Sequence, residues 1–118
     1  MGTFSVTVDI GDPAARRFES VEALVDTGAS YTMLSASLLS SLNVTPHTRR
    51  EFELATGEAV TRDIGRTWLR IDGHMEMTIV VFGDENAEPL LGAVTLEEFG
   101  LGVDPLRRRL IPVRGWLT

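Results

Sequence analysis

Alternation of apolar and polar residues is the clearest pattern along this chain of 118 residues. Residues 4–10 read Phe-Ser-Val-Thr-Val-Asp-Ile, in which every second position is apolar, as in a half-buried β-strand. The same period of two predicts strands over residues 16–26 and 75–81. We expect the methionines of the latter strand, Met75 and Met77, to lie in the core.

A long hairpin and a short final strand complete the predicted β-structure. Residues 49–56 and 58–72 form the two arms of the hairpin, which turns at Gly57. Residues 109–113 form the last strand. Pro112 places this strand at an edge or terminus, because proline has no N–H to donate to a neighbouring strand.

Two short helices are predicted between the strands. Residues 35–42 are serine- and leucine-rich, with Ser35 as the N-cap and the leucines about one turn apart. The second helix follows from a Thr-Leu-Glu-Glu segment that fits a capping box, with Thr95 as N-cap and Glu98 reaching back to it. Gly100 then occupies the position where a helix commonly ends in a left-handed residue.

Length and element order indicate one mostly-β domain over residues 1–118, folded as a barrel or sandwich with one or two short helices. A net charge of −6 argues against nucleic acids and anionic membranes as partners, since both favour a basic surface. The one basic run, Arg107–Arg109, is interpreted as a solvated turn. The chain has no cysteine, so disulfides and thiolate metal sites are excluded.

The N-terminus and the longest apolar runs indicate where in the cell the protein is expected. The first residues alternate in polarity and lack the basic region and apolar block of a secretory signal. No apolar run approaches the roughly 20 residues that a membrane helix needs. A cytoplasmic protein is therefore the default expectation, although the domain could also be part of a longer anchored or secreted chain.

A single aspartate ends the second predicted strand, within the segment Ala-Leu-Val-Asp-Thr-Gly-Ala-Ser at residues 23–30. A carboxylate in this position is costly unless it is hydrogen-bonded or has a chemical role. Gly28 follows closely, and a residue without Cβ lets the backbone turn tightly or lets a ligand approach. Each feature taken alone also fits an ordinary turn, because aspartate and glycine are common turn residues.

This segment, together with Pro-Leu-Leu-Gly at residues 89–92, resembles the retropepsin-like aspartic proteases, in particular the single-domain bacterial and cellular type. The order of motifs matches over nearly the whole chain. The resemblance implies a retropepsin-like closed barrel with one Asp-Thr-Gly per chain and an active site that is completed by homodimerisation. No second Asp-Thr-Gly or Asp-Ser-Gly is present in the sequence, which agrees with half a site per chain.

The resemblance also implies roles for individual residues. Asp26 is the expected catalytic carboxylate, and the active-site loop continues through Thr27, Gly28 and Ala29. Thr27 is expected to hydrogen-bond across the dimer, and Gly28 to present its backbone to the substrate. Two Asp26 carboxylates would share one proton, so that one activates water while the other protonates the scissile carbonyl.

The resemblance further implies a support behind the loop and a mobile flap above it. Leu91 is expected to pack behind the active-site loop, and Gly92 to admit a close crossing of chain segments. The hairpin around Gly57 is the candidate flap that closes over the substrate, although a plain surface hairpin is the alternative. The residues expected to contact substrate are Ser30 in the loop and Ala55, Thr56, Gly57 and Glu58 in the hairpin.

The sequence thus predicts an aspartic endopeptidase that acts on peptides or proteins as a homodimer. A catalytically silent relative that uses the same cleft to bind peptides or a partner is the main alternative. An aspartate-nucleophile hydrolase is a weaker one, because such enzymes usually carry a second aspartate two residues on, where this chain has Gly28. No cofactor or metal is expected, since His47 and His74 are isolated and no zinc motif is present.

Overall fold

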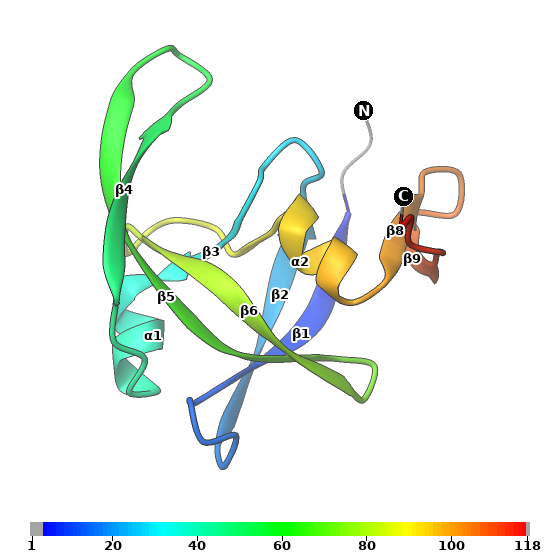
Figure 1. The fold of residues 1–118 in the computed structure, drawn as a ribbon, viewed down its shortest axis with the longest axis horizontal. Coiled ribbons are helices and arrows are strands. Elements are labelled where there is room, and N and C mark those ends of the chain that lie inside the picture. The colour runs from blue at the N-terminus through cyan, green and yellow to red at the C-terminus, as the bar shows by residue number, and fades with distance from the viewer. Residues whose placement is uncertain (1–3, 118) are drawn as a thin grey trace.

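The alternating segments become strands of a closed sheet in the computed structural model, which describes residues 4–117 (Figure 1). The strands are β1 (Ser5–Gly11), β2 (Phe18–Val25), β3 (Thr32–Ser35), β4 (Thr48–Glu53), β5 (Ala59–Ile71), β6 (His74–Gly83), β7 (Leu90–Leu91), β8 (Leu101–Asp104) and β9 (Arg109–Pro112). The helices are α1 (Ala36–Ser41) and α2 (Ala93–Glu98). No helix of this described part is long and apolar enough to cross a membrane.

The main sheet closes on itself. Over the described residues it has seven strands in the order β1-β2-β7-β3-β6-β5-β4, and β1 also pairs with β5 through Asp9↔Arg70 and Ile10↔Leu69. This extra pairing joins the two sides of the sheet and leaves β4 as an arm outside the ring. The predicted mostly-β closed barrel is therefore confirmed.

The short strand β7 connects the two halves of the barrel. It pairs in parallel with the end of β2, where Leu24 faces Leu90 and Val25 faces Leu91, and antiparallel with β3 at Met33. Asp26 directly follows this β2–β7 pairing, which brings together residues that are 66 positions apart in the chain. Strands β3, β7 and β8 were not expected from the sequence.

The remaining pair, β8 and β9, forms a separate two-stranded sheet. Pro112 lies opposite Leu101 at its edge, as proline's missing donor predicts. Figure 1 shows this pair on the side of the molecule away from the tip of the β4–β5 hairpin.

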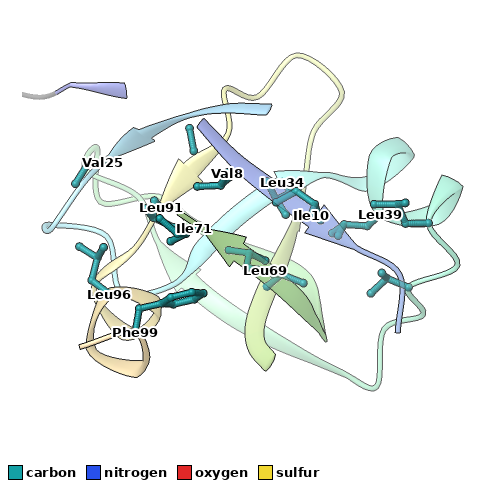
Figure 2. Close-up of a cluster of buried hydrophobic side chains, with 14 of the residues drawn as sticks. Val8, Ile10, Val25, Leu34, Leu39, Leu69, Ile71, Leu91, Leu96 and Phe99 are labelled. Atoms are coloured by element: carbon teal, nitrogen blue, oxygen red, sulfur yellow. The ribbon is translucent and has the colours of Figure 1, made fainter. Parts of the chain in front are cut away.

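The core fills the barrel and continues beneath both helices. Figure 2 shows the buried cluster, with Leu96 and Phe99 of the α2 region at one end and Leu39 of α1 at the other. Leu91 is completely buried in this cluster, as expected for a residue packed behind the Asp26 loop. Burial of such side chains stabilises the fold by about 1.5–3 kcal/mol each.

The first helix was predicted correctly. The Ser35 Oγ accepts a hydrogen bond from the Leu38 N–H at 3.2 Å, which is the expected N-cap contact. The left-handed residue after α2 is also confirmed, since Gly100 has φ of +66°.

The predicted capping box of the second helix is wrong. α2 begins at Ala93, two residues before Thr95, and Gly92 is its N-cap. The first N–H groups of the helix instead donate to backbone carbonyls of the loop after Asp26, so no side-chain cap is needed. Thr95 is buried, and the Glu98 carboxylate contacts Thr78 rather than the helix start.

The core placement of the β6 methionines is also wrong. Met77 is 37% exposed and Met75 is half-buried, whereas continuous burial of β6 begins at Thr78. β6 pairs with β3 only from Val80 onward, so its first half, which carries Met75 and Met77, extends beyond the end of β3.

Candidate active site

The Asp26 loop (residues 26–30) is held by hydrogen bonds within its own turn and by one bond to β7. The Gly28 N–H donates to Asp26 Oδ1 at 2.9 Å, and the Ala29 N–H donates to the Asp26 carbonyl at 3.2 Å. The Asp26 N–H in turn donates to the Leu91 carbonyl at 3.1 Å. These bonds fix both the carboxylate and the chain that carries it, and the side chain is half-buried at the end of β2.

Gly28 is suited to this turn because a side chain there would crowd the carboxylate. A Cβ built on Gly28 lies 3.2 Å from Asp26 Oδ1, tighter than an ordinary van der Waals contact. Glycine therefore lets the N–H approach the carboxylate without a steric cost.

Gly92 lies where two chain segments cross. A Cβ at this position would stand 2.5 Å from the Tyr31 carbonyl carbon and 2.8 Å from the Thr32 nitrogen. The predicted close crossing is therefore present, and it places β7 and the start of α2 directly against the loop that follows Asp26.

The start of α2 completes this support. The Ala93 N–H donates to the Ala29 carbonyl at 2.9 Å, and the Val94 N–H donates to the Ser30 carbonyl at 3.0 Å. A helix leaves its first N–H groups without partners in the helix itself, so these bonds satisfy the helix and anchor the loop together.

A pocket of about 490 Å³ lies between the Asp26 loop and the β4–β5 hairpin. Gly28, Ala29 and Ser30 form the loop side of its wall. Apolar side chains of the strands and the hairpin form much of the rest: Met33, Phe52, Leu54, Val60, Val81 and Leu90. A mostly apolar hollow with a few polar groups beside it is typical of a site that binds a ligand or a peptide side chain.

Tyr31 connects the loop to the hairpin. Its ring meets Phe52 of β4 edge-on, with ring centroids 6.0 Å apart. The Arg50 guanidinium lies 5.4 Å from the centre of the Tyr31 ring, and its Nη1 donates to the Tyr31 hydroxyl. These contacts tie the base of the hairpin to the segment that carries Asp26.

Charged side chains stand at the outer rim of the pocket. Arg62 of β5 forms an ion pair with Asp84 at 3.3 Å, and Glu53 of β4 also contributes to the wall. Among residues 4–117, no cluster of three or more histidine, aspartate or glutamate side chains could hold a metal ion.

Of the predicted loop and its support, Gly28, Ala29 and Ser30 line the pocket, whereas Asp26, Thr27, Leu91 and Gly92 lie outside its wall. The four predicted hairpin residues, 55–58, are exposed at the tip and do not contribute to the wall. Their contact with substrate stays a prediction. Sequence reasoning missed Tyr31, Phe52 and Arg62, although the alternation of residues 49–56 would have placed Phe52 on one face of its strand.

Comparison with known proteins agrees with this geometry. The solution structure of the simian foamy virus (mac) protease matches with a TM-score of 0.57 and 15% identity, covering 80% of this chain and 92% of that one. The EIAV protease complexed with the inhibitor HBY-793 matches with a TM-score of 0.59 and 20% identity, covering 84% and 89%. At these identities the likeness concerns the fold alone.

The sequence itself supplies the family. A comparison with curated proteins gives no match. Residues 6–95, however, match the family described as aspartyl protease, and this region includes the Asp26 loop, the hairpin and the Gly92 crossing. The chain therefore belongs to the aspartyl protease family and has a retropepsin-like fold.

Proposed function

We propose that the protein is an aspartic endopeptidase whose active site forms where two copies of the Asp26 loop meet in a homodimer. The observation that carries this proposal is the Asp26 carboxylate, oriented by the Gly28 N–H on a loop that also borders an apolar pocket. The family membership of the chain supports the same activity.

The need for a second copy follows from the chemistry. Peptide hydrolysis by this route requires one carboxylate that takes a proton from water and another that gives a proton to the scissile carbonyl. The sequence has one Asp-Thr-Gly segment, at residues 26–28. A twofold axis close to the loop would bring the same aspartate from a second copy beside the first, and the pair would titrate as a unit.

The pocket and the hairpin account for substrate binding in this proposal. A peptide lying between the loop and the hairpin would place an apolar side chain against Met33, Val81 and Leu90. Closure of the hairpin would exclude water from the scissile bond, which strengthens the electrostatic interactions with the carboxylates.

A peptide-binding module without hydrolysis is the second candidate. It is favoured by one observation, namely that the pocket wall of a single chain begins at Gly28 and does not include Asp26. A single chain could therefore bind a peptide side chain without using the carboxylate.

The two candidates are distinguished by cleavage of a denatured protein or a peptide library, with and without pepstatin. The endopeptidase predicts cleavage that pepstatin inhibits and that Asp26→Asn abolishes, while peptide binding persists. Asp72→Asn is the matched control, because Asp72 is exposed in a turn with φ of +49°, a conformation that asparagine adopts readily. Peptide binding without cleavage by the wild type would support the binding module instead.

A further inference from the structure

A line of hydrogen bonds runs from the Gly92 backbone amide through the protein interior to the surface. The Gly92 N–H donates to Thr32 Oγ1 at 3.1 Å, and Thr32 Oγ1 lies 2.6 Å from Thr95 Oγ1. Thr95 Oγ1 lies 2.8 Å from Thr78 Oγ1, which donates to the Glu98 carboxylate. The three threonines are at most 1% exposed, whereas Glu98 is an exposed residue near the end of α2. We refer to Thr32, Thr95 and Thr78 as the hydroxyl chain.

The carboxylate sets the direction of every proton in this chain. In its contact with Glu98 the Thr78 hydroxyl is the donor and the carboxylate oxygen is the acceptor. Thr78 therefore gives its single hydroxyl proton to Glu98 and must accept from Thr95. Thr95 in turn accepts from Thr32, and Thr32 accepts from the Gly92 N–H.

A count of protons shows why the chain needs its surface acceptor. The Gly92 amide and the three hydroxyls supply four protons, whereas the contacts among these groups number three: Gly92–Thr32, Thr32–Thr95 and Thr95–Thr78. Glu98 supplies the fourth contact. Without it, one proton would be left unpaired in the interior whichever way the chain points, and an unpaired buried donor is costly.

The inner end of the chain is attached to the Asp26 loop. Gly92 follows Leu91, whose carbonyl accepts the Asp26 N–H, and its own backbone crosses Tyr31 and Thr32 in close contact. Thr95 belongs to α2, whose first N–H groups bind the Ala29 and Ser30 carbonyls. A shift in the hydroxyl chain would therefore move both supports of the loop.

We propose that Glu98 is a positioning residue for the Asp26 loop. It accepts the last proton of the hydroxyl chain from outside the pocket and thereby holds the Gly92 crossing and α2 against the loop. The kinetic part of the test below depends on the proposed function, whereas its hydrogen-exchange part does not.

The test replaces Glu98 and follows amide hydrogen exchange by NMR together with peptide cleavage. Glu98→Ala removes the acceptor, so the Gly92 and Asp26 amides should exchange about tenfold faster relative to the amide of Leu69, a fully buried residue of β5. For the same reason kcat should fall about tenfold, while KM changes less than about twofold because the pocket is intact.

Two further variants make the test specific. Glu98→Gln keeps a carbonyl oxygen that can accept from Thr78, so exchange and kcat should return close to wild-type values. Glu97→Ala is the matched control, because Glu97 is exposed one residue earlier on the same helix and lies outside the hydroxyl chain. It should leave both readouts unchanged.

Three results would overturn the proposal. The first is an unchanged exchange ratio of Gly92 to Leu69 in Glu98→Ala, since general destabilisation would accelerate both amides alike. The second is an equal effect of Glu97→Ala, and the third is a failure of Glu98→Gln to restore the ratio. If no variant and no wild type cleaves peptides, the endopeptidase proposal fails and the exchange ratio still decides the role of Glu98.

Discussion

Gly92 has no room for a side chain, and the reason is steric rather than conformational. Its φ of −93° is open to any residue, but a Cβ would approach the Tyr31 backbone to 2.5 Å. Backbone atoms cannot rotate away as the end of a flexible side chain can. Any residue larger than glycine must therefore push β7 and α2 away from the loop that follows Asp26.

We predict that Gly92→Ala destabilises the fold by about 2 kcal/mol or more, because overpacking forces the backbone to shift. Urea unfolding measures this as a lower transition midpoint. Gly115→Ala is the control, since a Cβ at Gly115 meets nothing within 4 Å. An equal midpoint for Gly92→Ala and wild type would show that the crossing opens at little cost.

A second residue-scale feature is the Asp9 carboxylate on the barrel wall. The Ser20 hydroxyl donates to Asp9 Oδ1 at 2.6 Å and the Arg70 Nε donates to Oδ2 at 3.0 Å. These bonds, the Ser20 bond first, lower the pKa of Asp9 from its ordinary value of 3.8. Because the charged form is favoured in the folded state, the resulting stabilisation is present above pH 3.8 and is lost as the pH falls through the lowered pKa.

Asp9→Asn should therefore lower the free energy of unfolding near pH 7, and the difference from wild type should shrink below pH 3.8. Denaturant unfolding across this pH range provides the measurement. Asp63→Asn serves for comparison, because its ion pair with Arg49 is exposed and such pairs contribute little. A difference between Asp9→Asn and wild type that stays constant with pH would contradict the argument.

At the scale of elements, the β4–β5 hairpin is held to the rest of the chain mainly at its base. Its tip is closed by two backbone hydrogen bonds of 2.8 Å between Leu54 and residues 57 and 58, and all side chains of the tip are exposed. The contact of Phe52 with Tyr31 lies closer to the barrel. If the hairpin is a flap, we expect its tip to move while this contact keeps its base in place.

Loss of this contact should weaken peptide binding. We predict that Phe52→Ala raises KM about threefold to tenfold, because it removes both a pocket wall and an aromatic pair worth about 0.5–1.5 kcal/mol. The effect on kcat should be smaller. Leu54→Ala provides the comparison, since Leu54 also lines the pocket but is 41% exposed. Steady-state kinetics on one peptide measure KM and kcat for each variant. An unchanged KM for Phe52→Ala would exclude a role of Phe52 in peptide binding.

Among the strands, the sequence predicted mainly those that are long and have a clear period of two. The arms of the hairpin, β1, β2 and β6 span six residues or more, which is enough for a period of two to be visible. Strands β3 and β7 have four and two residues and exist through pairing with distant segments, as in Leu24↔Leu90. No local pattern can reveal such pairing.

The error at α2 has a related cause. A Thr-x-x-Glu segment places two side chains one turn apart whether they cap a helix or lie within one. In this fold the helix start is satisfied by carbonyls of the Asp26 loop, and Thr95 turns into the interior toward Thr32. The family motif could be read from the chain, but the hydroxyl chain behind it depends on tertiary contacts.

At the scale of the whole molecule, the proposed function predicts that the active unit contains two copies of the chain. If the site needs two Asp26 residues, an equal mixture of wild-type and Asp26→Asn chains that pairs at random contains roughly one quarter wild-type dimers. Activity per total chain should then fall to roughly one quarter of the wild-type value, after unfolding and refolding together. A site complete in one chain predicts one half instead.

A separate experiment can locate the contact between copies. Trp116 and Leu117 are 92% and 98% exposed in the single chain, and large apolar side chains at the surface often mark an interface. If the C-terminal segment joins that interface, Trp116→Ser should weaken pairing, so that sedimentation shows more monomer and activity falls on dilution. A Trp116→Ser protein with an unchanged monomer fraction would place the contact elsewhere.

The β2–β7 pairing also has a consequence for the synthesis of the protein, because it joins an early and a late segment of the chain. The Asp26 N–H binds the Leu91 carbonyl, and the loop carbonyls bind the start of α2. A ribosome adds residues from the N-terminus onward, so the aspartate is made long before the segment that orders it. If Asp26 is catalytic as proposed, a growing chain carries this carboxylate on an unsupported loop, and nascent chains meet no ordered site until residues 90–94 have emerged from the ribosome.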